Sequence, residues 1–291
     1  MSIIDEIKES FKKGSVLTRL IYVNIGVFVV LRVLYVLFYL VNQDFSLLNW
    51  LALPADIHQL AYKPWTLITY MFLHFGFLHI LFNILWLYWL GKIFLFYFNE
   101  RQLLGVYLLG GISGGIFYLA AYNLLPVFAN SVPVTQLLGA SAAVIAIVIA
   151  VAVWAPNHAI NLMFIGPVKM KYIALVSLLM YVIGIAGSNA GGNLAHIGGA
   201  FLGMIFVLQY RKNKDLTKWV NQLIDELVKV FKPRQRIKVS YKGNAPADDI
   251  EYNRQRNHKQ EEINRVLEKI SNSGYDSLTK EEKELLFKMG K

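Results

Sequence analysis

Six segments of this sequence are long and apolar enough to cross a lipid bilayer as helices. A bilayer core of about 30 Å requires roughly 20 apolar residues per helix. The expected spans are residues 20–41, 66–90, 102–125, 139–155, 171–187 and 193–210. Apart from Lys171 at the edge of the fifth span, Arg32 is the only Asp, Glu, Lys or Arg within them. The sequence therefore predicts an all-α membrane protein built on a six-transmembrane-helix bundle.

The composition agrees with a membrane protein and excludes several other classes. Apolar residues make up 56% of the chain and charged residues 16%, whereas a soluble domain carries about 25% charged residues. The formal net charge is +10, but it is concentrated at the ends and in short connections, so we expect no nucleic-acid partner. The absence of cysteine excludes disulfides and thiolate metal sites.

Lysine and arginine are unevenly divided between the two sides of the predicted bundle. One side holds Lys8, Lys12, Lys13, Arg19, Lys92, Arg101, Lys169, Lys171, Arg211, Lys212 and Lys214. The other side holds only Lys63. Because cytoplasmic connections are rich in Lys and Arg, we expect both termini in the cytoplasm. The charged N-terminus has no apolar core followed by a cleavage site, so we expect no removable signal peptide, and a bacterial inner-membrane location.

The predicted spans divide the chain into three parts. Residues 1–19 form a cytoplasmic N-terminal segment, residues 20–210 a membrane domain, and residues 211–291 a basic cytoplasmic tail. On the outer side, residues 125–138 carry no charge, as if part of this loop lies at membrane depth. Irregular backbone is tolerated there only where protein or a water-filled cavity surrounds it.

The tail is predicted to hold helices separated by a linker. Apolar residues recur at helical spacing between residues 216 and 230, which predicts an amphipathic helix lying on the membrane or on the bundle. Proline, glycine and mixed charge over residues 232–259 indicate a linker. A short helix is expected at 260–271, and Thr279 with Glu282 forms a capping-box pattern that opens another. A structural or regulatory appendage is favoured over a partner-binding module.

Four polar residues stand out within the apolar spans. His79 and Asn83 are four residues apart on the second span, so they share one helix face. Ser141 opens the fourth span, and His196 lies near the start of the sixth. Polar groups inside a membrane are costly, and by default they mark functional sites. We therefore take these four as candidate site residues.

The depth of these residues can be counted from the cytoplasmic ends of their helices. Ser141 precedes Pro156 by as many residues as His196 precedes Arg211. With a rise of about 1.5 Å per residue, both side chains lie roughly 22 Å above the cytoplasmic edge. The same count places His79 at a similar depth. All of them can therefore face one pocket near the outer membrane face.

A serine and a histidine at one depth favour nucleophilic catalysis. A serine hydroxyl is a weak nucleophile until a base takes its proton, and His196 is the candidate base at matching depth. Amide cleavage also builds negative charge on the carbonyl oxygen, which the backbone N–H of Ser141 and the side chains of His79 and Asn83 can stabilise. Small neighbours let the two helices approach closely. They are Gly139, Ala140, Ala142, Gly198, Gly199 and Gly203.

Each of these signals also has a structural interpretation. A Gly-x-Ser sequence in a transmembrane helix usually serves helix packing. A single histidine near a helix start is usually a hydrogen-bonded structural residue. The combination of matched depth, small neighbours, a shared histidine and asparagine face and a short fourth span favours catalysis over packing alone.

Three motifs together resemble the rhomboid family of intramembrane serine proteases. They are His74-x4-His79-x3-Asn83, Gly139-x-Ser141 and Ala195-His196-x2-Gly199-x3-Gly203. Their order and spacing across residues 20–210 fit the six-helix core of that family, and the aromatic outer loop 42–65 is similar to its first loop. The resemblance implies that Ser141 is the nucleophile, His196 the general base and acid, and His79 and Asn83 the oxyanion-stabilising residues. It implies no metal and no cofactor.

The sequence departs from the family pattern at two positions near the serine. The family commonly has glycine where this chain has Ala142, which narrows the pocket by one methyl group but leaves the backbone donor. Many members carry an aromatic residue against the catalytic histidine where this chain has Ile145, so the histidine ring needs another wall. We interpret His74 as a structural residue.

The favoured hypothesis is a serine endopeptidase that cleaves transmembrane-helix substrates near the outer membrane face by a Ser-His dyad. Its partners would be transmembrane protein substrates and membrane lipids. One alternative is a catalytically silent rhomboid-like protein that binds membrane clients. Another is a transporter or channel, although such proteins usually carry ionisable groups near the midplane, where this chain has only Arg32.

Overall fold

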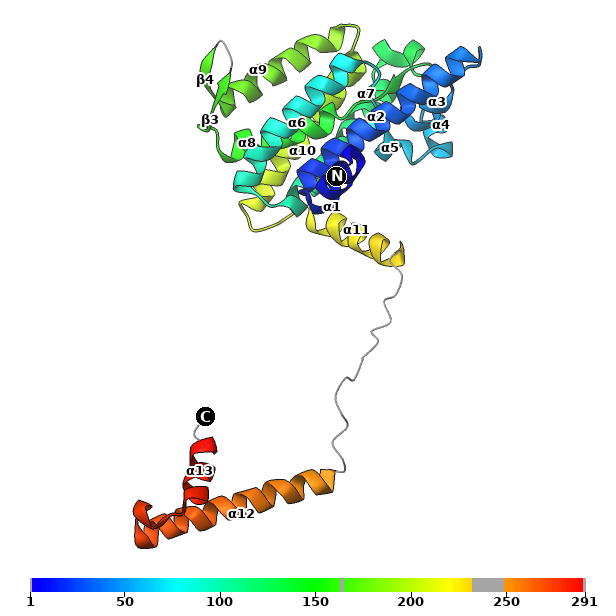
Figure 1. Ribbon diagram of the computed structural model, residues 1–291. Coiled ribbons are helices and arrows are strands. Elements are labelled where there is room, and N and C mark those ends of the chain that lie inside the picture. Colours follow the sequence, from blue (N-terminus) through cyan, green and yellow to red (C-terminus); the bar gives the residue numbers. More distant parts are fainter. Residues whose placement is uncertain (1, 163–164, 232–248, 290–291) are drawn as a thin grey trace. The chain divides into compact units, whose positions relative to one another are not determined.

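The computed structural model describes residues 2–162, 165–231 and 249–289 of the chain. These residues belong to two compact units (Figure 1). We call Met1–Lys232 the membrane unit and Pro233–Lys291 the C-terminal unit.

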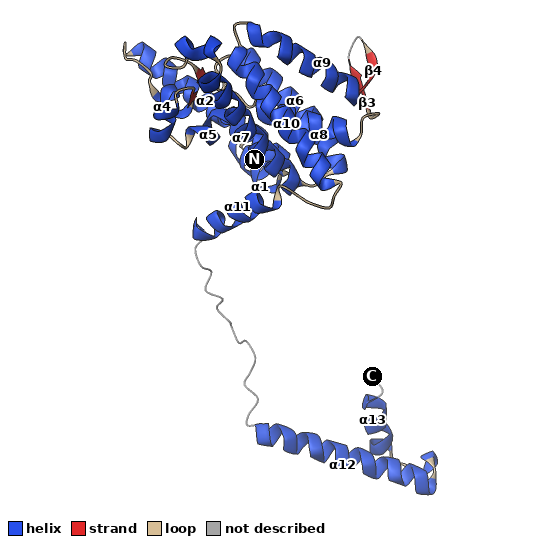
Figure 2. Ribbon diagram, turned by 180° about the vertical axis from the view of Figure 1, so that it is seen from behind, coloured by secondary structure: helices blue, strands red, loops and turns tan. Residues whose placement is uncertain are grey.

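The membrane unit is built almost entirely from helices (Figure 2). Its α-helices are α1 (Ile3–Lys13), α2 (Val16–Leu40), α3 (Leu47–Leu51), α4 (Ile57–Tyr62), α5 (Thr66–Thr69), α6 (Phe77–Tyr97), α7 (Glu100–Leu124), α8 (Ser141–Trp154), α9 (Met170–Ile183), α10 (Ala190–Tyr210) and α11 (Lys218–Phe231). Short 3-10 turns cover Tyr70–Phe72, Pro126–Ser131 and Gly184–Ala186. The strands β1 (Leu53–Pro54) and β2 (Gln136–Leu137) form one antiparallel pair, and β3 (Ala159–Leu162) and β4 (Gly166–Lys169) form another.

Apolar helices occupy all six predicted spans in the predicted order. Among the described residues, four of them are long and apolar enough to cross a membrane, namely α2, α6, α7 and α10. The other two, α8 and the helix from Met170 to Ala186, are shorter. An α-helix of the length of α8 extends only about 21 Å, which is less than a bilayer core. The helical membrane fold is confirmed, whereas the number of full-length spans counted in the structure is four.

The second predicted span, 66–90, is wrong as a single helix. The structure breaks this segment into α5, a 3-10 turn and an extended residue at Leu73, and α6 begins only after Gly76. The first part is held by hydrogen bonds from the Thr69 and Tyr70 hydroxyls to the carbonyls of Leu51 and Gly111. A hydropathy pattern detects apolar residues but not breaks in the backbone. The residues on both sides of this break are mostly apolar, so nothing in the sequence indicates that the helix is interrupted.

The two loops that are predicted on the outer side are joined to each other and to the bundle. The pairing of β1 with β2 is extended by a hydrogen bond from the Ala55 amide to the Thr135 carbonyl. The Gly139 amide, at the end of the second loop, donates to the Tyr70 carbonyl. These bonds satisfy backbone groups that would otherwise be costly at membrane depth. They explain how the uncharged 125–138 loop can lead directly into α8.

Helix α8 is the central helix of the membrane unit. Every residue from Ala142 to Ala152 is buried, and α8 contacts α6, α7, α9 and α10. The contact with α10 is so close that a Cβ atom on Gly199 would lie 2.1 Å from the carbonyl oxygen of Ala142. Small residues of this kind let two helix backbones approach when lipid supplies no hydrophobic driving force.

The helix predicted over residues 216–230 is present as α11 and packs on the start of α7. The Arg101 guanidinium pairs with Asp225 at 2.9 Å, and the Asn221 side chain donates to the Arg101 carbonyl at 3.0 Å. Gln102 donates to Asp215 at 2.9 Å. Burial raises the pKa of the Asp215 carboxyl, but hydrogen bonds, chiefly from Thr217 and Gln102, outweigh it and lower that pKa below its usual value. The compact unit therefore continues past residue 210, through α11.

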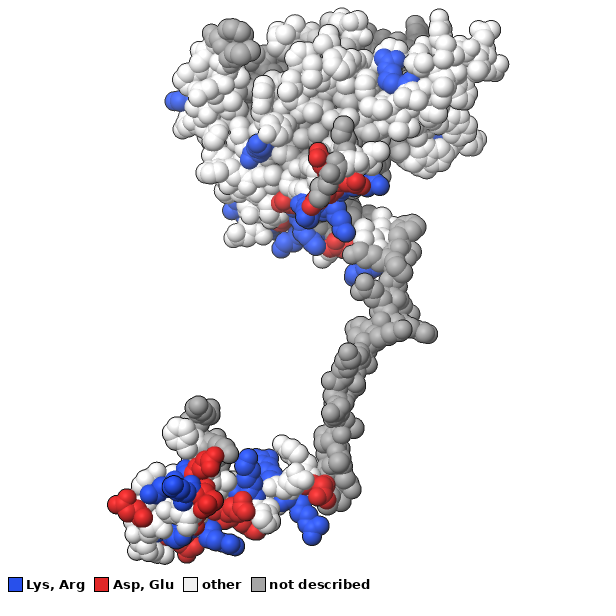
Figure 3. All heavy atoms as spheres, viewed as in Figure 1, with Lys and Arg blue, Asp and Glu red and all other residues white. Residues whose placement is uncertain are grey.

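Charged side chains are concentrated in a small part of the visible surface of the membrane unit. In Figure 3 they gather around α1, while the rest of this face of the unit is mainly uncharged. This distribution agrees with the charge pattern expected for a protein whose spans are embedded in lipid.

The C-terminal unit contains α12 (Asp249–Ser273), a 3-10 turn at Tyr275–Ser277 and α13 (Lys280–Met289). The linker predicted over 232–259 is wrong for residues 249–259, which are helical, and its part at 232–248 lies outside the described residues. The helix expected at 260–271 is correspondingly longer. Residues 249–259 are almost all polar, so there is no apolar periodicity from which a helix could be predicted. The capping box is confirmed by reciprocal bonds between Thr279 and Glu282.

Candidate active site

Ser141 and His196 meet inside the membrane unit. The Ser141 Oγ atom lies 2.6 Å from Nε2 of His196, which is a short hydrogen bond. Ser141 is the first residue of α8, and His196 lies in the second turn of α10. The structure therefore brings together two residues that are far apart in sequence and that were paired by counting helix depth.

The contact between α8 and α10 fixes the relative height of these two residues. At their C-terminal ends the rings of Trp154 and Tyr210 are in contact, with centroids 5.7 Å apart. At the other end are Ser141 and His196. Because both helices rise by the same amount per residue, contact at one end keeps the residues at the other end level.

The backbone before Ser141 turns at Gly139. Its φ angle of +127° is disfavoured for residues with a side chain. A Cβ atom at Gly139 would lie 2.9 Å from Cε1 of His79 and 3.7 Å from Oγ of Ser141. The histidine ring and the serine hydroxyl therefore both lie close to the space that a side chain at position 139 would occupy.

His79 and Asn83 lie on α6 as their spacing predicted. Asn83 is buried, and its side-chain amide donates to the His79 carbonyl at 2.9 Å. Asn83 also lines the same cavity as Ser141. The structure thus brings all four predicted site residues to one region, two from α6 and one each from α8 and α10.

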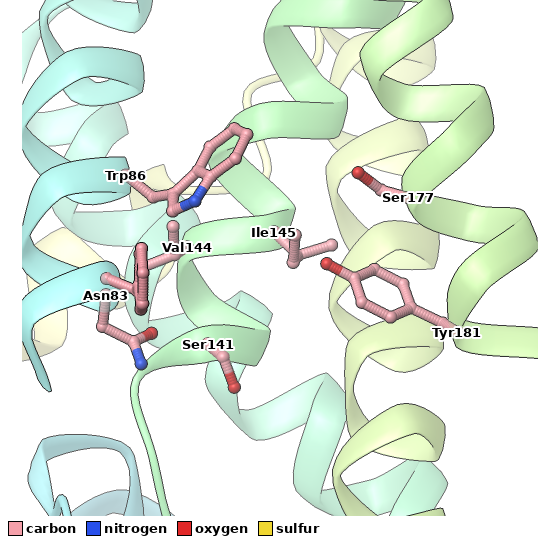
Figure 4. Close-up of a pocket in the computed structure, with 8 residues that line it drawn as sticks. Asn83, Trp86, Ser141, Val144, Ile145, Ser177 and Tyr181 are labelled. Carbon is pink, nitrogen blue, oxygen red and sulfur yellow. The ribbon is translucent and has the colours of Figure 1, made fainter. Parts of the chain in front are cut away.

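A cavity of about 200 Å³ lies beside Ser141. It is lined by Phe82, Asn83, Trp86, Ser141, Val144, Ile145, Ser177 and Tyr181. Figure 4 shows that these side chains come from three sides, with Asn83 and Trp86 on α6, Ile145 on α8 and Tyr181 on α9. None of the described residues that line this cavity is charged. An apolar cavity with a few polar groups next to a hydroxyl suits an apolar ligand side chain.

His74 is the buried neighbour of the site. Its ring centroid lies 5.2 Å from that of His79, and only 4% of the residue is exposed. Neither ring nitrogen has a hydrogen-bond partner among the described residues. His74 therefore packs against His79, and no hydrogen bond joins it to Ser141.

Tyr181 is the site residue that sequence reasoning missed. Its ring centroid lies 4.4 Å from that of His196, with an angle of 56° between the planes. Because position 145 is isoleucine, the sequence predicts that the His196 ring needs another wall, without indicating which residue supplies it. The fifth span offers Tyr172 and Tyr181, and only the rotation of α9 in the folded bundle decides which of them faces inward.

These features define a helical membrane protein that holds a hydrogen-bonded serine and histidine inside its bundle. Comparison with known families finds a rhomboid domain over residues 61–213. This match covers more than half of the chain, so the chain belongs to the rhomboid family. A family of unknown function (DUF6576) matches residues 248–289, which include both helices of the C-terminal unit.

Individual relatives agree with this membership. The chain is 31% identical over 209 residues to RHOMBOID-like protein 12, mitochondrial, of Arabidopsis thaliana, an alignment covering 68% of this chain and 59% of that protein. It is 25% identical over 198 residues to rhomboid protease GlpG of Yersinia pseudotuberculosis, covering 67% of this chain and 64% of that protein. The GlpG protease of Serratia proteamaculans is 32% identical over 116 residues, covering 34% and 41%.

The chain spans less than two thirds of the length of each of these relatives. The resemblance drawn from the three motifs is confirmed, because the family match includes all of them. The relatives support assignment to a family of intramembrane proteases.

Proposed function

We propose that this chain is an intramembrane serine endopeptidase that cleaves transmembrane-helix substrates near the outer membrane face. The observation that carries the proposal is the 2.6 Å contact between Ser141 Oγ and His196 Nε2. A nucleophile and a base within hydrogen-bond reach form the basic unit of acyl-transfer catalysis. The apolar cavity beside Ser141 adds room for a substrate side chain.

The bond-making and proton-transfer steps involve these two side chains and water. His196 Nε2 takes the Ser141 proton as Oγ attacks the substrate carbonyl carbon, and the resulting imidazolium donates that proton to the leaving amine as the C–N bond breaks. Water then attacks the acyl ester. It gives one proton to His196, which returns that proton to Ser141 Oγ and releases the carboxyl product. The net reaction is amide plus water to acid plus amine.

The negative charge on the attacked carbonyl oxygen needs donors aimed at it. Ser141 begins α8, and the first N–H groups of a helix have no partner within the helix. The side chains of His79 and Asn83 converge on the same region from α6. We assign these three groups to the oxyanion.

Replacing Asn83 with alanine is expected to lower kcat by roughly 100-fold, because one oxyanion donor is lost. KM should change little, since the substrate ground state gains less from that donor than the transition state. Steady-state cleavage of a single-span substrate in proteoliposomes measures both constants. Asn123→Ala is the matched control, because that asparagine donates to Ala55 in the outer loop. Equal losses in the two variants would remove Asn83 from the mechanism.

The location and orientation are part of the proposal. The distribution of Lys and Arg in the sequence supports cytoplasmic termini, and bacterial GlpG proteases are among the relatives. We therefore propose an inner-membrane protein of a bacterium. In this orientation Ser141 begins α8 at the outer side, where a substrate helix can unwind close to water.

The transporter alternative depends on Arg32 as a charged group in a transport path, and the contacts of Arg32 argue against that role. The guanidinium donates to the Phe75 carbonyl and lies over the Phe75 ring, 5.3 Å from its centroid. This charged group of α2 is therefore bound by Phe75, which lies just before α6. An arginine with these partners has a structural explanation that requires no transport path.

The catalytically silent alternative rests on Ala142 and Ile145, which depart from the family pattern. A fluorophosphonate probe separates it from the protease, because the probe bonds covalently only to an activated serine. We expect the purified full chain to be labelled, with the label on Ser141 by peptide mapping. Absence of label, or label on another serine at the same level, would contradict the proposal and favour a client-binding protein.

A further inference from the structure

Among the described residues, His196 has no hydrogen-bond partner of the kind that usually orients a catalytic histidine. In a triad, a third group bonds the second ring nitrogen and fixes the ring. Here Nδ1 of His196 is buried and has no hydrogen-bond partner among the described residues. If Nε2 is to accept the serine proton, the proton of the neutral ring must sit on Nδ1. Packing contacts therefore have to hold the orientation of the ring.

The backbone of α10 is fixed, but this does not fix the ring. The close contact of Gly199 with Ala142 sets the distance between α10 and α8. It leaves the two side-chain torsions of His196 unconstrained. Rotation about either torsion would move Nε2 away from Ser141 Oγ and break the 2.6 Å contact.

We propose that Tyr181 of α9 positions the His196 imidazole, as the wall that α8 does not provide. This inference rests on the proposed function of Ser141 and His196. The two ring centroids lie 4.4 Å apart in a tilted arrangement, just short of the roughly 4.5–7 Å that aromatic pairs prefer, so the rings are in direct contact.

The surroundings of Tyr181 explain why it can take this position. Ile145 lies one helical turn after Ser141 and is an aliphatic residue that leaves space beside it. Figure 4 shows the Tyr181 ring extending from α9 toward Ile145, with Ser177 one turn earlier on the same helix. An aromatic side chain at position 145 would compete for this space. The aliphatic residue on α8 and the tyrosine on α9 therefore form a complementary pair.

The function of Tyr181 is tested by removing its ring and then supplying a ring from α8. Tyr181→Phe keeps the ring and is expected to retain cleavage within about twofold. Tyr181→Leu keeps apolar volume but no ring, and we expect kcat and the rate of fluorophosphonate labelling to fall by at least roughly tenfold, because small displacements of a base are costly. KM should stay within about twofold. The double variant Ile145→Phe with Tyr181→Leu should recover most of the labelling rate.

The small probe reports the state of the serine and histidine without a substrate helix, so it separates positioning from substrate binding. Tyr172→Leu is the matched control, because Tyr172 is an exposed tyrosine on the same helix. Thermal unfolding in detergent shows whether each variant is folded. If Tyr181→Leu is not, the cleavage and labelling rates are measured on Tyr181→Met instead.

The outcomes for Tyr181 and for the proposed function are distinguishable. Unchanged labelling of Tyr181→Leu would overturn the positioning role while wild-type labelling on Ser141 keeps the protease assignment. A rise in KM alone would overturn it too, because Tyr181 would then act on substrate binding. Failure of the double variant to recover would show that a ring against His196 is not what matters. A wild-type chain that is neither labelled nor active would overturn the proposed function itself.

Discussion

Replacing Ser141 with alanine is expected to abolish cleavage of transmembrane substrates while leaving the protein folded in the membrane. The change removes one oxygen atom, and its hydrogen-bond partner His196 keeps the packing contact with Tyr181. Loss of the nucleophile leaves no route to an acyl intermediate, so cleavage should fall at least about 1,000-fold. The measurement is co-expression with candidate single-span proteins, comparing fragments from wild-type and variant cells.

Two further variants make this result specific. Ser46→Ala changes an exposed serine that makes no capping hydrogen bond at α3, and it should cleave as the wild type does. His196→Ala keeps the Ser141 hydroxyl but removes its base, so it should lose both cleavage and fluorophosphonate labelling. Cleavage that persists in Ser141→Ala would refute the assignment, whatever the other variants do.

Replacing Gly199 with valine is expected to destroy the site and to destabilise the bundle. A Cβ atom at Gly199 would lie 2.1 Å from the Ala142 carbonyl oxygen, which is backbone and cannot rotate away. Helices α8 and α10 would have to separate, and the contact between Ser141 and His196 would open. Overpacking of this kind costs about 3 kcal/mol. Cleavage and labelling should both disappear, and thermal unfolding in detergent should occur at a lower temperature.

The control for this prediction is another glycine in an apolar helix. A Cβ atom on Gly26 of α2 would meet no atom within 4 Å, so Gly26→Val introduces the same side chain without a clash. It should retain activity and stability close to the wild type. If Gly199→Val also retained labelling of Ser141, the close approach of α8 and α10 would not be needed for the site.

The parts of the site that sequence could predict are those that depend on helix rise alone. Ser141 and His196 were paired by counting residues to the cytoplasmic helix ends, and the rise per residue is nearly constant. His79 and Asn83 were grouped by helix periodicity, which is equally regular. Their roles in catalysis remain proposals, but their proximity follows from these two regularities and the order of the spans.

The parts that sequence could not predict depend on packing or on backbone breaks. Tyr181 reaches His196 because α9 is rotated in one particular way against α8 and α10, and hydropathy does not report rotation. The break before α6 was hidden because the residues on both sides of it are apolar. Residues 249–259 were misassigned for the opposite reason, since a helix of polar residues has no apolar pattern to detect.

The turn that begins α7 has a practical consequence for dividing this protein into parts. Glu100 accepts a hydrogen bond from the Val16 amide at the start of α2, while Arg101 and Gln102 bind Asp225 and Asp215 near the C-terminal end of the membrane unit. A chain shortened to Tyr210 would thus lose the contacts of Arg101 and Gln102 with Asp225 and Asp215, although every apolar span would be intact. We therefore expect an excised or fused version of the membrane unit to need α11, which belongs to the same compact unit.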